Sequence, residues 1–64
     1  MTEPTRYRLD TPRIGTPGRP FAWKVLRRDD ATEVERSRET FRSRHEALAD
    51  GLQTVLAWER GERS

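Results

Sequence analysis

Arginine dominates the chemistry that this 64-residue chain offers, since 13 residues are basic and all of them except Lys24 are arginines. Guanidinium groups bind phosphates and stack on bases, and a neighbouring aromatic residue extends such a platform for single-stranded nucleic acid. The basic residues of interest fall within the first twenty residues and between residues 24 and 44. The candidate contact residues for a nucleic acid or a partner protein are Arg6, Arg8, Arg13, Arg19, Lys24, Arg27, Arg28, Arg36, Arg38, Arg42 and Arg44.

Acidic residues alternate with the second group of basic residues. They are Asp29, Asp30, Glu33, Glu35 and Glu39. A nucleic-acid site usually gathers positive charge on one face, whereas interleaved charges are typical of a solvated surface whose groups pair with one another. Trp23, which precedes Lys24, is also needed to build a core. The charge pattern therefore makes nucleic-acid binding the second choice of function.

The stretch Pro17-Gly-Arg-Pro20 matches two recognition patterns. It resembles the Gly-Arg-Pro end of an AT-hook, which lies in a narrow minor groove, but the first arginine of that motif is missing. It also has the Pro-x-x-Pro spacing that aromatic grooves recognise. A plain tether is the simplest interpretation, because the surrounding segment is rich in proline.

No arrangement of residues indicates catalysis or a bound cofactor. His45, the sole histidine, is expected at an exposed helical position without a cleft or an orienting partner. The carboxylates near Asp29 and Asp30 lack the register and the turn glycine of a calcium loop. The chain has no cysteine, which excludes disulfides and argues against a structural zinc site. We therefore expect no enzyme activity, no metal and no cofactor.

The longest helical pattern covers residues 43–59 and should position the rest of the chain. Ser43 and Glu46 have the spacing of a capping box, and Gly61 fits a C-terminal stop. Gly51 costs roughly 1 kcal/mol inside a helix, so its place among the apolar positions predicts a close contact with an aromatic residue or a strand; the alternative is a helix broken there. The stripe expected to pack on a sheet consists of Ala47, Leu48, Gly51, Leu52, Val55 and Trp58, with Leu56 at its edge.

Alternating residues predict an antiparallel hairpin before this helix. Residues 21–28 form the first strand, residues 29–32 the turn and residues 33–38 the returning strand. Tyr7-Arg-Leu9 alternates as well, which leaves a third short N-terminal strand open. The expected fold class is α+β, a small ββα unit in which the hairpin packs on one C-terminal amphipathic helix.

Composition divides the chain into three parts. Residues 1–20 contain all four prolines and carry the whole net charge of +2, four arginines against Glu3 and Asp10, which predicts a flexible leader. Residues 21–60 form the ββα domain, and residues 61–64 a frayed tail. So short a domain buries little surface, so a homodimer is an open expectation. No segment resembles a membrane span or a signal peptide, so the cytoplasm is the expected compartment.

Several packing residues resemble those of the YegP-like family of small bacterial proteins, which are built from a repeated ββα unit. The resembling residues lie within residues 21–56 and are Phe21-x-Trp23-x-Val25-Leu26, Val34-x-x-Ser37-x-x-x-Phe41-x-Ser43-Arg44, Ala47 and Gly51-Leu52. The family tends to have an Asn-Gly hairpin turn, which this chain lacks, and many members carry two units. The resemblance implies the ββα fold and a dimer in place of the tandem pair, and it implies no catalytic residues.

The function expected from the sequence is that of a non-enzymatic interaction or accessory protein. It would act through the edge or the exposed face of its sheet, with an unidentified protein or a second copy of itself as the partner. The alternative is a nucleic-acid-binding protein that uses the arginines of the leader and of the hairpin.

Overall fold

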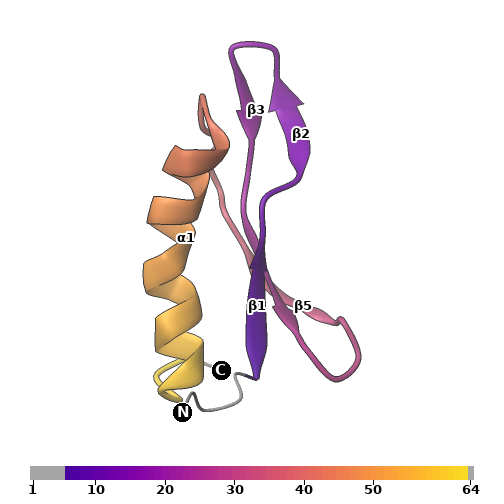
Figure 1. The fold of residues 1–64 in the computed structure, drawn as a ribbon, viewed down its shortest axis with the longest axis vertical. Coiled ribbons are helices and arrows are strands. Elements are labelled where there is room, and N and C mark those ends of the chain that lie inside the picture. Colours follow the sequence, from indigo (N-terminus) through magenta and orange to yellow (C-terminus); the bar gives the residue numbers. More distant parts are fainter. Residues whose placement is uncertain (1–5, 64) are drawn as a thin grey trace.

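The computed structural model describes residues 6–63 and shows an α+β architecture in which one helix lies along one side of the strands (Figure 1). The main antiparallel sheet has the order β1-β4-β5, formed by β1 (Tyr7–Asp10), β4 (Lys24–Arg27) and β5 (Glu33–Arg36). Helix α1 (Arg44–Glu59) follows β5 and packs on β1 and β4. The expected fold class is confirmed, and β1 is the third, N-terminal strand that the sequence left open.

Strand β1 lies inside the segment that the sequence assigned to a flexible leader. All four of its residues pair antiparallel with β4. The backbone amides of Arg6 and Tyr7 donate to the Glu59 carboxylate at 3.2 and 2.9 Å, which ties this strand to the end of α1. The leader expectation is therefore wrong for residues 6–20, because strands occupy most of them, whereas residues 1–5 lie outside the described part of the chain.

A second hairpin, made of β2 (Arg13–Thr16) and β3 (Arg19–Phe21), projects beyond the main sheet (Figure 1). Pro17 and Gly18 form its two-residue turn, and Pro20 is buried. A proline followed by a glycine is a strong turn signal, and two strands flank it here. The proline-rich motif is therefore part of a hairpin, and neither a tether nor an extended recognition segment.

The strand expected over residues 21–28 is in fact two strands. It breaks after Phe21, whose amide donates to the Phe41 carbonyl at 3.1 Å, while the Phe41 amide donates back to the Phe21 carbonyl at 2.6 Å. Next to this bridge, the Trp23 amide donates to the Ser37 hydroxyl at 3.2 Å. The alternation of side chains continues through the break, so periodicity alone could not show where the backbone changes partner.

The connection between β4 and β5 is the expected turn. The Asp30 Oδ1 atom accepts from the Thr32 amide at 3.0 Å, as aspartate side chains do in turns. Ala31 has a φ of 60°, in the left-handed region that glycine adopts more easily. A register shift then interrupts the β4–β5 pairing. This irregularity, together with the charged residues of β5, discourages another strand from pairing at this edge.

Helix α1 begins and ends where its capping residues predict. The Ser43 hydroxyl accepts from the Glu46 amide at 3.2 Å, which satisfies one of the free donors of the first turn. Gly61 has a φ of 75°, and its amide donates to the Trp58 carbonyl at 3.1 Å. Residues 61–63 therefore start with a helix cap instead of the expected frayed tail.

The core is small and centres on Trp23, which is 5% exposed and packs with Val25 and Val55. Gly51 lies directly against this tryptophan: a Cβ atom on Gly51 would come 2.7 Å from Trp23 Cγ and 2.8 Å from Leu9 Cδ1. The helix continues unbroken through this glycine. The close contact expected for Gly51 is confirmed, and the missing side chain is what lets α1 lie so near the sheet.

Part of the apolar stripe expected on α1 does not face the sheet. Ala47, Gly51 and Val55 are buried, whereas Leu48 and Leu52 are 40% and 51% exposed. The small residues Ala47 and Gly51 allow the helix to approach the sheet most closely, so they face it. Leu48 and Leu52 directly follow them and are therefore turned away by about 100° around the helix axis. The prediction that Leu48 and Leu52 pack on the hairpin is therefore wrong.

Candidate functional site

The basic residues expected to form one contact surface lie in four places, the first of which surrounds Phe21. The Cζ atoms of Arg13 and Arg44 are 5.6 and 5.8 Å from the centroid of its ring. Arg19 and Arg42 line a hollow of about 230 Å³ near the start of α1, together with two glutamates. These two guanidinium groups occupy positions over the phenylalanine ring where a base would otherwise stack.

The second place is the other end of β4. Arg6, Arg27 and Arg28 line a hollow of about 470 Å³ there. The Arg28 Nε atom donates to the Tyr7 carbonyl at 3.2 Å, and Arg27 lies 3.8 Å from an Asp30 carboxylate oxygen. Arg28 is therefore engaged with the backbone of β1, and Arg27 with the acidic turn.

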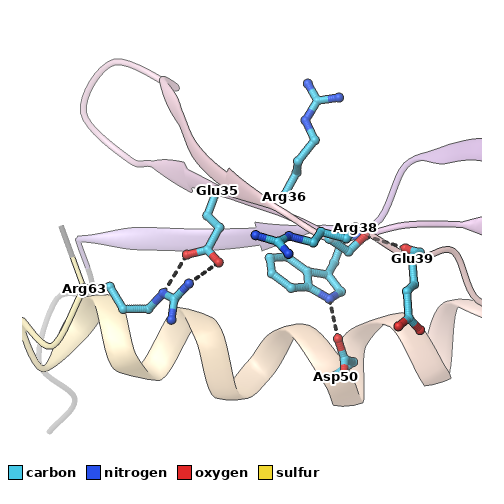
Figure 2. Close-up of a pocket in the computed structure, with 8 residues that line it drawn as sticks. Glu35, Arg36, Arg38, Glu39, Asp50 and Arg63 are labelled. Carbon is cyan, nitrogen blue, oxygen red and sulfur yellow. Dashed lines mark hydrogen bonds and ion pairs between the residues drawn. The ribbon is translucent and has the colours of Figure 1, made fainter.

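A third hollow, of about 300 Å³, lies between β5 and α1, and Figure 2 shows its charged lining. Arg38 is exposed at this hollow. The buried indole of Trp23 forms another part of the lining, and its Nε1 atom donates to Asp50 at 2.8 Å. This bond satisfies the one polar group of the indole. Trp23 therefore belongs to the core and is not an exposed stacking platform.

Glu35 is the centre of a network that the sequence did not indicate (Figure 2). Its Oε1 atom accepts from Arg63 Nε at 2.6 Å and from Trp58 Nε1 at 2.9 Å, and a second contact makes the arginine pair bidentate. The hydrogen bond from Arg63 is the main reason that the pKa of the Glu35 carboxyl lies below its ordinary value. Burial raises this pKa, and the hydrogen bond from Trp58 lowers it again. Arg63 lies 28 residues from its partner, in the segment expected to be frayed, so no local signal pointed to it.

Replacing Glu35 with glutamine is expected to destabilise the protein by about 1 kcal/mol at neutral pH, because a charged hydrogen bond to Arg63 is lost. The folded-state pKa is depressed, so this stability is present above the unfolded value of about 4.3 and is lost as the pH falls through the folded value. Urea unfolding near pH 7 and near pH 3 should therefore show a difference between wild type and variant that shrinks in acid.

The matched control for this titration is Glu33→Gln. Glu33 also pairs with an arginine, Arg36, but the arginine side chain is 65% exposed. Loss of this ion pair should therefore change the stability by only a few tenths of a kcal/mol. A Glu35→Gln difference that is the same at both pH values would contradict the assignment.

The fourth place is the face of the main sheet turned away from α1. The strand register sets Lys24 opposite Arg36 and Arg8 opposite Leu26, and alternation puts all four on this outer face. Figure 2 shows Arg36 pointing away from the helix, and its Nε atom lies 2.6 Å from Glu33 Oε2. None of the ion pairs within the described part of the chain involves Arg8 or Lys24.

An apolar groove of about 160 Å³ lies on this outer face, where the β2–β3 hairpin meets the main sheet. Ile14, which is 64% exposed, belongs to its hairpin side, and Pro12 and the buried Ala22 also line it. Lys24 and Arg36 lie at its rim, where Glu33, which also lines the groove, pairs with Arg36 and leaves the charge of Lys24. We call Pro12, Ile14, Ala22, Lys24 and Arg36 the Ile14 groove. An apolar patch with a polar rim is the usual composition of a protein-binding surface.

The structure thus does not bring the eleven predicted contact residues together. The Ile14 groove includes only two of them, and its apolar members were missed because Ile14 and Pro12 lie in the segment assigned to a leader. Within residues 6–63, no group of three or more histidine, cysteine or acidic side chains could hold a metal ion. His45 is exposed on α1, as expected.

Comparison with protein-family models, with curated proteins and with solved structures found no match for this chain. The resemblance to the YegP-like proteins therefore stays a prediction. Among the described residues, no helix has the length and apolar character needed to span a membrane.

Proposed function

We propose that the protein is a small non-enzymatic interaction module that binds a partner protein through the outer face of its main sheet. The observation that carries this proposal is the Ile14 groove. An exposed isoleucine beside the buried Ala22 forms a place where one apolar side chain of a partner would be desolvated. Lys24 at the rim would attract an acidic residue next to that side chain.

The face of the sheet is favoured over its edges as the contact surface. The β5 edge carries a register shift and the charged residues Glu33, Glu35 and Arg36, features that hinder the addition of another strand. The β1 edge strand is only four residues long and is held at its start by Glu59. Neither edge offers an apolar anchor comparable to Ile14.

The titration behaviour of the described residues supports a role without catalysis. The pKa shifts belong to surface ion pairs or to a turn: Glu33 with Arg36, Glu35 with Arg63, and Asp30 with the Thr32 amide. Arg60 and Glu62 form the remaining pair of this kind. A catalytic acid or base usually shows a shift toward neutral pH in a cleft, whereas these carboxyl pKa values are all lowered.

The nucleic-acid alternative receives no specific support from the geometry. The candidate arginines lie in separate places, and Arg27 and Arg36 are paired with acidic side chains. A site for nucleic acid would need these charges on one continuous face.

The test is selection of peptides from a random display library on the full chain, followed by titration of the selected peptides observed by NMR. We expect the peptides to combine an apolar residue with a neighbouring acidic residue and to shift the amide signals of Ile14 and Ala22. Ile14→Glu should weaken their binding by at least about tenfold, because it places a charge in the apolar anchor. The matched control Gln53→Glu adds the same charge on α1 and should leave binding unchanged.

Two results would overturn the proposal. The first is a set of peptides that bind Ile14→Glu as well as they bind the wild type. The second is an oligonucleotide that binds at low salt and dissociates steeply as salt rises, which would favour the nucleic-acid alternative.

A further inference from the structure

The β2–β3 hairpin and the start of α1 lie at the same end of the molecule, and four arginines belong to this end (Figure 1). We call Arg13, Arg19, Arg42 and Arg44 the arginine end. Two of them lie over the Phe21 ring, and the other two line the hollow of about 230 Å³. All four residues are exposed, and none of the ion pairs found among residues 6–63 involves them.

The arginine end carries an excess of positive charge. The segment from residue 11 to residue 23 contains two of its arginines and no acidic residue. Glu39 and Glu46 line the hollow, so four guanidinium groups are set against two carboxylates. Exposed guanidinium groups without an ion pair keep their donors available for carboxylates of another molecule.

Thr40 connects the arginine end to the Ile14 groove. This residue lines both the groove and the hollow of Arg19 and Arg42, so the two lie next to each other. Gly15 makes room for it, because a Cβ atom on Gly15 would come 2.8 Å from Thr40 Cγ2. An extended peptide advances by about 3.3 Å per residue, so a few residues lead from the groove past Thr40 to the arginines.

We propose that the partner protein binds with a two-part segment, which places an apolar residue in the Ile14 groove and a nearby cluster of aspartates or glutamates on the arginine end. This inference rests on the proposed function of the groove and adds the chemistry of the partner. Charge complementarity favours an acidic segment, since guanidinium groups bind carboxylates through pairs of hydrogen bonds. The apolar residue supplies the anchor, and the acidic cluster distinguishes this partner from others with a similar apolar residue.

The test uses peptides selected on the Ile14 groove and synthesised with four added glutamates, or with four added glutamines as the matched control, at either end. At one of the two ends, the glutamates should tighten binding to the full chain by roughly threefold or more, as measured by fluorescence anisotropy. The gain should shrink as salt rises from about 0.05 to 0.5 M, because salt screens exposed charges. Equal binding of the glutamate and glutamine peptides at low salt would overturn the inference.

Three arginine variants locate the acidic contact. Arg19→Gln and Arg42→Gln should each remove part of the gain that the glutamates give. Arg60→Gln removes the same charge at the other end of α1, about 24 Å away, and should keep the full gain. A gain that Arg60→Gln reduces as much as Arg42→Gln does would reflect the overall charge of the chain and would overturn the assigned position.

Glu39→Gln tests the same contact in the opposite direction. The variant keeps the Glu39 carbonyl, which accepts from the Ser37 hydroxyl at 2.8 Å, so the fold should be retained. Removing the carboxylate beside Arg42 should tighten the glutamate peptides by about twofold and leave the glutamine peptides unchanged. Glutamate peptides that bind the variant and the wild type equally would contradict the acidic contact.

Failure of this inference can be told apart from failure of the proposed function. Ile14→Glu should weaken the peptides with either extension, because it changes the groove that both use. Peptides that bind this variant as well as the wild type would overturn the proposed function and the two-part segment with it. Weakening by Ile14→Glu, with no difference between glutamates and glutamines, would overturn the inference alone. An oligonucleotide that binds the arginine end more tightly than the glutamate peptides would also overturn it.

Discussion

Trp23→Ala is expected to leave most of the chain unfolded at room temperature. Truncating a buried tryptophan costs about 3–5 kcal/mol, and the single core of so short a domain rarely supplies more than about 3–5 kcal/mol of stability. Trp23 is 5% exposed and forms the centre of the core with Val25 and Val55. Far-ultraviolet circular dichroism during thermal and urea unfolding measures the effect.

The conservative variant Trp23→Phe tests how much of the loss comes from removing the whole aromatic side chain. It keeps an aromatic ring between the sheet and α1 but loses the Nε1 bond to Asp50, so it should fold with a smaller loss of about 1–2 kcal/mol. A Trp23→Ala protein that melts like the wild type would show that this side chain is not in the core.

Gly51→Leu is expected to have the second largest effect, a net loss of about 2–3 kcal/mol. Leucine is the better helix former by roughly 1 kcal/mol, so helix propensity alone would make the variant more stable. Its first side-chain atom, however, would meet Trp23 Cγ at 2.7 Å, and three further carbons would follow into the same space. Urea unfolding followed by circular dichroism gives the sign of the change directly.

Gln53→Leu is the matched control for this variant. It introduces the same side chain two positions along α1, where the surface is exposed, and should change stability by no more than about 0.5 kcal/mol. A Gly51→Leu variant that is more stable than the wild type would mean that α1 does not lie against Trp23.

Local signals were sufficient for the helix. Ser43 and Glu46 are three residues apart and Gly61 acts on its own last turn, so each cap depends only on near neighbours in the chain. The contact at Gly51 was also predictable, because a costly residue among apolar positions implies a compensating close approach. The two caps do not depend on how the rest of the chain folds.

Pairings between distant residues were not predictable in the same way. Strand β1 exists because it pairs with β4, and the bridge between Phe21 and Phe41 ends one strand and starts another. Pro17 and Pro20, two of the four prolines that suggested a leader, instead form the turn and the buried end of the β2–β3 hairpin. Ile14 was therefore placed in the wrong part of the molecule, and with it the groove that we propose as the contact site.

The orientation of α1 against the sheet was also beyond the reach of the sequence pattern. Periodicity gave a broad apolar side that included Leu48 and Leu52, but only contact with the sheet could show that Ala47 and Gly51 occupy its centre. The arginines illustrate the same limit, because their sequence spacing does not reveal which strand end or ion pair each one reaches. Arg63, which the sequence assigned to a tail, makes a bidentate pair with Glu35.

The contact between Gly51 and Trp23 fixes how α1 lies on the sheet, and the exposure of Leu48 and Leu52 depends on it. Nuclear Overhauser effects between the Gly51 α-protons and the Trp23 side chain measure this contact most directly. Strong effects to the indole ring and the β-protons of Trp23 are expected, with similar effects to the Leu9 methyl groups. Their absence, with effects from Leu48 or Leu52 to Trp23 in their place, would contradict the orientation of the helix.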